Sequence, residues 1–156
     1  MDGIVDPTAD VLFDAVSYDI TATGIAETKP QSRREWAEIR RHALLLAEAS
    51  NLLKMAGRRV APAQPFLKRE PDAPSPEDLT PAQIQALIDE DPAALTRLAQ
   101  GLADAAMVAL KAADAQSVEG LFEAGDAIDN ACENCHLKYW YPKDKKPALD
   151  ALKRKK

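Results

Sequence analysis

The chain has few aromatic residues, only two cysteines and no long apolar run, and each shortage narrows the class of protein. No apolar stretch approaches the roughly 20 residues that a membrane-spanning helix needs. The acidic opening MDGIVDPTAD lacks the apolar core of a signal peptide. No stretch alternates Val, Ile and Thr, so strands are not expected. Ala, Leu, Glu and Lys favour helices, and the 156 residues are predicted to form one all-α domain.

Charge is distributed unevenly along the chain, although its net value is only −5. Residues 143–156 hold seven of the 20 basic and two of the 25 acidic side chains. The preceding residues carry 13 basic against 23 acidic side chains, a net charge of −10. An acidic body argues against a nucleic-acid partner. We expect residues 143–156 to be a solvated basic tail, the alternative being a segment that docks on an acidic protein or membrane surface.

Capping signals divide the chain into helices. Asp6-Pro7 is typical of a helix start and predicts an amphipathic helix over residues 8–20, followed by a connector at 21–31. Ser32, with Glu35 three residues later, forms a capping box that opens a helix over about residues 33–56. Gly57 then closes that helix.

A proline-rich loop separates this half from the next. Residues 58–79 contain five prolines, and a loop of this length is often functional. Thr80 opens a short helix over about residues 81–89, Asp91 opens one over about 92–114, and Ser117 caps the last, which ends near residue 140. Four principal helices with mostly short connections predict a four-helix up-down bundle.

The only two cysteines stand three residues apart, and a histidine follows the second directly: Cys132, Cys135 and His136. A structural zinc site needs four ligands, but the only other histidine is His42. A thioredoxin-type dithiol needs a βαβ context, which the sequence does not show, and a disulfide within one helical turn is strained. The pattern therefore favours c-type haem attachment, with both thiols bonded to haem and His136 on the iron.

Helical geometry places these groups on one stripe. At about 100° per residue, Cys135 and His136 fall within about 60° on either side of Cys132. The same arc contains four further residues: Leu121, Gly125, Ile128 and Tyr139. Gly125 is costly within a helix, and close approach by another helix would explain it. The alternative is a coincidental pair of buried thiols.

A CxxCH motif near the end of an acidic four-helix bundle resembles the class II cytochromes c, the cytochrome c′ group. Cys132, Cys135, His136 and Tyr139 match that family's C-x-x-C-H-x-x-Tyr-Arg motif, but Trp140 stands in place of the arginine. The segments PTADVLFDAV and ACENCHLKYWYP look like a bacterial branch of the family. The resemblance covers most of the chain in architecture, but its specific motif is only the haem box. It implies a haem-binding bundle over residues 1–142, with residues 143–156 as the tail.

The resemblance implies one covalent haem c and a function in periplasmic electron transfer to a partner redox protein. The alternatives are a five-coordinate haem protein that binds NO or CO, and a haem subunit of a larger redox complex. Covalent attachment occurs outside the cytoplasm, so a removed signal peptide is implied. Membrane contact is not expected, and a homodimer is compatible with the bundle. No acid–base constellation indicates an enzyme.

The ligand opposite His136 distinguishes an electron carrier from a gas-binding protein. His42 lies about 22 Å before the end of its helix whereas His136 lies about 6 Å before the end of the last helix, so the two levels differ by about 16 Å. We therefore expect His42 to be a satisfied core histidine. Met55 is expected to fill a gap in the bundle, and Met107, deep in its helix, is expected to be a core residue.

Met1 is the leading candidate for the second iron ligand, since the first helix could extend back through Pro7 with a kink. Met ligation would give a six-coordinate electron carrier. If Leu12 or Phe13 covers the iron instead, the site is five-coordinate and open to gas. Electron transfer leads because Trp140 replaces the family's arginine.

Overall fold

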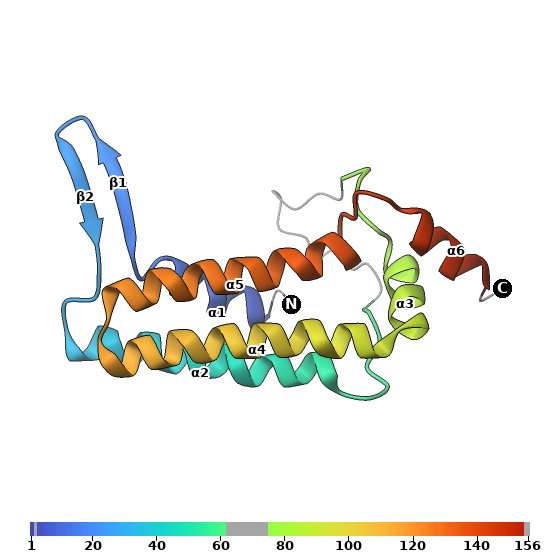
Figure 1. Cartoon of the computed structure of the whole chain (residues 1–156), viewed down its shortest axis with the longest axis horizontal. Coiled ribbons are helices and arrows are strands. Elements are labelled where there is room, and N and C mark those ends of the chain that lie inside the picture. The colour runs from blue at the N-terminus through green and yellow to red at the C-terminus, as the bar shows by residue number, and fades with distance from the viewer. Residues whose placement is uncertain (2, 62–74, 155–156) are drawn as a thin grey trace.

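The long helices lie side by side, with a hairpin projecting at one end and two short helices at the other (Figure 1). The computed structural model describes residues 1, 3–61 and 75–154. In order, the elements are α1 (Val5–Phe13), β1 (Ser17–Thr21), β2 (Gly24–Thr28), α2 (Arg33–Lys54), α3 (Pro81–Glu90), α4 (Pro92–Ala115), α5 (Val118–Tyr139) and α6 (Lys146–Arg154). Within the described ranges, no helix combines the length and apolar character needed to cross a membrane.

The capping residues lie where the sequence predicts them. Ser32 Oγ accepts from the Glu35 backbone N–H at 3.2 Å, while the Glu35 carboxylate accepts from the Ser32 N–H at 3.0 Å. Thr80 forms the same reciprocal box at the start of α3. Asp91 and Ser117 accept from backbone N–H groups in the first turns of α4 and α5. These contacts satisfy N–H groups that have no partner within the helix, so the predicted starts of α2, α3, α4 and α5 are confirmed.

Small side chains build the main core. The most extensive contact between described helices is that of α2 with α4, and Ala43, Ala106 and Ala109 on these helices are fully buried. α1 packs mainly on α2, and α4 packs on α5. Leu46 and Ile128 are the largest fully buried apolar side chains. The core shared by α1, α2, α4 and α5 therefore depends on close fit of small residues rather than on aromatic bulk.

The hairpin contradicts the expectation of an all-α chain. The helix predicted over residues 8–20 ends at Phe13, and β1 pairs with β2 antiparallel, with Ile20 opposite Ile25 and Thr21 opposite Gly24. Gly24 has a φ of +133°, which suits the turn. Tyr18, which lies within the helix predicted over residues 8–20, instead stacks on Phe122 of α5 with ring centroids 5.1 Å apart. Thr, Ile and Tyr around the turn favour strands, so the prediction of a helix was wrong there.

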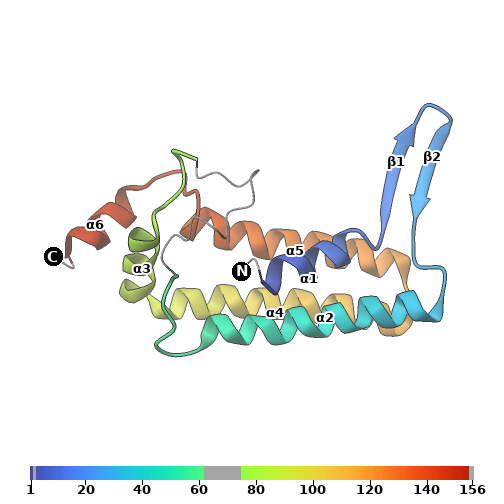
Figure 2. The same cartoon turned by 180° about the vertical axis from the view of Figure 1, so that it is seen from behind.

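Residues 146–154 also differ from the prediction, because they form a helix rather than a solvated tail. α6 packs on α3, and Ala148 and Ala151 are buried in a second apolar cluster with Leu87 and Tyr139. Figure 2 shows α3 and α6 together at the end opposite the hairpin. Of the predicted proline-rich loop, residues 62–74 lie outside the described residues. Its last residues return to the bundle, where the Leu79 N–H donates to the Trp140 carbonyl at 2.7 Å.

Candidate functional site

The two cysteines lie in the last turns of α5, at the junction of the two apolar clusters. Both are half-buried and neither is in a disulfide. Cys132 packs against the main core, whereas Cys135 packs against the cluster formed by α3, α6 and Tyr139. Two thiols and the His136 imidazole therefore share the C-terminal end of one helix, as the sequence predicts.

Burial keeps both thiols protonated. It raises the pKa of Cys132 to about 11, and the charges of Cys135, Asp129 and Asp6 act in the same direction. Burial also raises the pKa of Cys135. Reactive redox cysteines have the opposite property, a lowered pKa that populates the thiolate at neutral pH. The electrostatics therefore argue against a thioredoxin-type dithiol.

The His136 imidazole has one nitrogen engaged within the protein. Nδ1 lies 3.2 Å from Tyr141 Oη, and that hydroxyl lies 2.7 Å from Glu133 Oε2. Among the described residues, Nε2 has no hydrogen-bond partner. Burial lowers the pKa of His136, while the charges of Glu133, Asp6 and Asp129 oppose that effect. The lowered pKa favours the neutral imidazole, which is the form that binds metals.

Aromatic rings surround the imidazole at the end of α5. The Trp140 ring meets His136 edge-on with centroids 5.0 Å apart, and the Tyr141 ring is 5.6 Å away. Tyr139 turns the other way and is buried in the second cluster. Its hydroxyl is buried without a hydrogen-bond partner among the described residues, and burial raises its pKa to about 12. Tyr139 therefore packs beside Cys135, and its buried hydroxyl is an orphaned polar group.

The N-terminal turn of α1 lies near this site. The Asp6 carboxylate is close enough to act on the pKa values of both Cys132 and His136. α1 includes Pro7 and begins at Val5, so the helix extends back through Pro7 as expected and starts four residues after Met1. The Met1 carbonyl accepts from the Val5 N–H at 3.0 Å, while the Met1 residue is 51% exposed.

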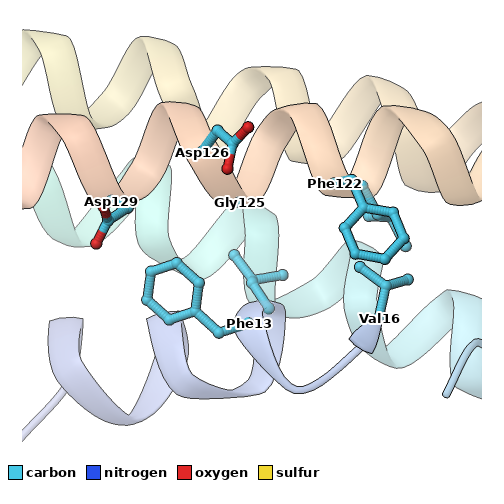
Figure 3. A pocket seen from close by; sticks show the side chains of 8 residues that line it. Phe13, Val16, Phe122, Gly125, Asp126 and Asp129 are labelled. Atoms are coloured by element: carbon cyan, nitrogen blue, oxygen red, sulfur yellow. The ribbon is translucent and has the colours of Figure 1, made fainter. Parts of the chain in front are cut away.

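A cavity of about 350 Å³ separates α1 from the middle of α5 (Figure 3). It is lined by Leu12, Phe13, Val16, Leu121, Phe122, Gly125, Asp126 and Asp129. A Cβ added at Gly125 would meet nothing within 4 Å, so the predicted close helix approach there is wrong. Leu12 and Phe13 thus face the stretch of α5 that precedes Cys132.

The other candidate iron ligands lie in different surroundings. His42 Nε2 is 3.1 Å from Glu38 Oε1 and 2.9 Å from Arg41 Nη2, but its buried Nδ1 has no partner among the described residues. The expected satisfied core histidine is therefore only half satisfied. Met107 is 41% exposed, so its prediction as a core residue was wrong. Met55 follows the end of α2 and is exposed as well.

The hydrogen bonds that link Glu133 and Tyr141 to His136 were not predicted from the sequence. Glu133 stands three residues before His136, a spacing that puts two side chains on one helix face, and this signal could have been used. Tyr141 lies beyond the helix, so no helical periodicity predicts its contact. The turn that follows Tyr139 brings it back to His136.

Within the described part of the chain, no group of three or more His, Cys, Asp or Glu side chains is arranged to hold a metal ion. No protein-family model, curated protein or solved structure matches this chain.

Proposed function

We propose that this chain is a c-type cytochrome that carries one covalent haem and transfers electrons to a partner redox protein outside the cytoplasm. The observation that carries the proposal is the state of three side chains at the end of α5. Cys132 and Cys135 are not in a disulfide, and His136 has Nδ1 engaged while Nε2 has no hydrogen-bond partner among the described residues. This is the donor set that haem attachment requires.

The surroundings of Cys132, Cys135 and His136 are compatible with a bound haem. An axial histidine usually donates its second N–H to a neighbouring acceptor, which fixes the ring, and Tyr141 Oη lies in that position. Each thiol would add across one vinyl group: sulfur bonds to the carbon nearer the ring, and the thiol hydrogen goes to the terminal carbon. Bound iron would supply one-electron redox chemistry. The half-buried apolar surroundings of both thiols suit an apolar macrocycle.

The proposal also concerns the arrangement of the helices. α1, α2, α4 and α5 would be the four helices of an up-down bundle of the class II cytochrome c type. Their shared core supports this assignment. The nine residues of α1 make it much shorter than the 22-residue α5.

Covalent attachment is tested by producing the chain with a secretion leader in a host that attaches haem outside the cytoplasm. We expect the intact mass to equal the chain plus one haem, and the haem to stay with the protein in acid–acetone. The Cys132→Ser, Cys135→Ser double variant should lose the haem. Asn134→Ala, at the exposed position between the two cysteines, is the control. A bare-chain mass for the parent protein would overturn the proposal.

Iron ligation is tested with the two histidines of the chain. His136→Ala should change the spectrum in the way that loss of an axial ligand does, while the thioethers keep the haem attached. His42→Ala should leave the spectrum unchanged and affect stability only. A ligand-type spectral change in the His42 variant would show that the iron lies at another level of the bundle.

Gas binding is the second candidate function, and the exposure of Met1 favours it. Half of the residue is exposed, and α1 starts four residues after it, at Val5. The reduced protein would then bind CO rapidly and be high-spin. Met1 ligation predicts a low-spin spectrum and slow CO uptake, so one spectrum with and without CO decides between the two functions.

A further inference from the structure

His136 is the last member of a chain of hydrogen bonds that starts at a carboxylate. Tyr141 Oη lies 2.7 Å from Glu133 Oε2 and 3.2 Å from His136 Nδ1. An ionised carboxylate can only accept, so the single hydroxyl hydrogen of Tyr141 is donated to Glu133. Towards the imidazole, the hydroxyl oxygen can then only accept. His136 must therefore carry its hydrogen on Nδ1, which leaves the lone pair on Nε2.

The end of α5 builds this chain from local structure. Glu133 and His136 are three residues apart and lie on one face of the helix. The N–H groups of Trp140 and Tyr141 both donate to the His136 carbonyl, at 2.8 and 3.1 Å. The backbone therefore turns back over the last helical turn and brings the Tyr141 hydroxyl to the imidazole. The edge-on contact with Trp140 restrains the ring further.

We infer that Tyr141 and Glu133 are positioning residues for His136, holding its Nδ1–H tautomer and passing part of the Glu133 charge to Nε2. The inference rests on the proposed function for its effect on iron, but the tautomer is a property of the chain itself. A hydrogen bond from the distant ring nitrogen to an acceptor raises the basicity of the ligating nitrogen. A more basic ligand stabilises ferric over ferrous iron, so this chain of bonds would lower the reduction potential.

The molecule provides a matched control. Tyr18 Oη donates to Glu27 Oε1 at 3.2 Å, which is also a tyrosine–glutamate bond, but it lies on the exposed hairpin. Tyr18→Phe removes a tyrosine hydroxyl, as Tyr141→Phe does, but this hydroxyl makes no contact with His136. For the carboxylate, Glu123 is exposed on α5 and serves as the control for Glu133.

The tautomer is measured first, in the full-length haem-free chain, from the ¹⁵N chemical shifts of His136. We expect the Nδ1–H form in the parent chain and in Tyr18→Phe. Tyr141→Phe should shift the ring towards the Nε2–H form that free histidine prefers. An Nε2–H ring in the parent chain would overturn the inference, as would an unchanged tautomer in Tyr141→Phe.

The effect of the Glu133 charge on the iron is measured in the haem-loaded protein. The readout is the midpoint reduction potential at one fixed pH. Tyr141→Phe and Glu133→Gln should both raise the potential relative to Tyr18→Phe and Glu123→Gln. Glu133→Gln keeps an acceptor for the tyrosine, so it should raise the potential while retaining the Nδ1–H tautomer. Equal potentials in all four variants would overturn the effect on iron.

Failure of the inference is distinguishable from failure of the proposed function. If the parent protein acquires no haem, the proposed function fails and the effect on iron fails with it. The tautomer measurement then still decides whether the hydrogen-bond chain exists. If haem is attached but the potentials do not differ, the function stands and only the role of Tyr141 and Glu133 is lost.

Discussion

The N-terminal and C-terminal halves of α5 differ in how completely their side chains are buried and hydrogen-bonded. In the first half, Leu121, Ala124 and Ile128 are at most 2% exposed and pack into the main core. In the second half, both cysteines and His136 are only partly buried, and the buried Tyr139 hydroxyl has no partner among the described residues. One helix therefore combines a well-packed half with a half that retains unsatisfied groups. Such groups are typical of a place where a ligand completes the structure.

The contrast extends to what each half contacts. The first half meets α4 through the small residues of the main core, and a close fit of this kind contributes mainly to stability. The second half meets the second cluster through Cys135 and Tyr139 and the start of α1 through the charge of Asp6. Substitutions in the first half should therefore change folding, and substitutions in the second half should change chemistry.

Ile128→Ala should have the largest effect. The side chain is fully buried, and its truncation leaves a cavity that the tightly packed neighbours cannot fill. We expect the free energy of unfolding to fall by about 3 kcal/mol, within the range for such truncations. Urea denaturation of the haem-free chain measures the loss. Cys135→Ala should cost clearly less, and an equal cost for the two would remove the contrast between the halves.

The Cys132 thiol should react slowly and with a strong dependence on pH. With its pKa raised from 9.0 to about 11, the thiolate fraction at pH 8 falls by about 100-fold, and the thiolate is the reactive form. Alkylation by iodoacetamide in the haem-free Cys135→Ala chain should therefore be about 100-fold slower than in an unstructured cysteine peptide. The rate should rise about tenfold per pH unit up to about pH 10. A plateau below pH 9 would contradict the raised pKa.

The same shift in pKa makes stability depend on pH at the alkaline end. The folded chain holds the Cys132 proton more tightly than the unfolded chain, whose thiol has the ordinary pKa of 9.0. The contribution to stability is therefore complete below about pH 9 and is lost as the pH rises towards 11. Cys132→Ala should show a smaller loss over that range, which urea denaturation at several pH values would measure.

Tyr139→Phe should stabilise the haem-free chain. The substitution keeps the buried ring and removes a hydroxyl that has no partner among the described residues. Leaving such a group buried costs about 1–3 kcal/mol, so we expect a gain towards the lower end of that range. Thermal and urea unfolding both report the gain. A loss of stability would mean that the hydroxyl has a partner in solution, and the second half of α5 would then be better satisfied than it is here.

Ser117→Ala should have the smallest effect. The hydroxyl accepts from the Gly120 N–H at 3.0 Å and caps the first half of α5. Loss of an N-cap costs about 1 kcal/mol. Circular dichroism during urea unfolding should show that loss without any change in the reactivity of Cys132. A change in that reactivity would show that the two halves are coupled.

Helix starts were predictable because they depend on neighbouring residues. Ser32 has its capping partner in Glu35, Thr80 in Gln83 and Ser117 in Gly120. Each partner lies within one turn, so the sequence contains the whole interaction. The hairpin was missed although Ile20 and Ile25 flank a Thr-Gly turn, because weak strand preferences were outweighed by the helical composition around them. Tertiary packing on Phe122 holds Tyr18 in the strand.

The candidate site likewise has features that the sequence predicts and features that it does not. The spacing of Cys132, Cys135 and His136 and the helix that carries them follow from the sequence, because helical periodicity relates residues of a single turn. The cavity beside Gly125 and the burial that raises the pKa of Cys132 are decided by tertiary structure. Both depend on how far the neighbouring helices lie from α5. Such distances depend on the packing of the whole molecule, which local sequence does not contain.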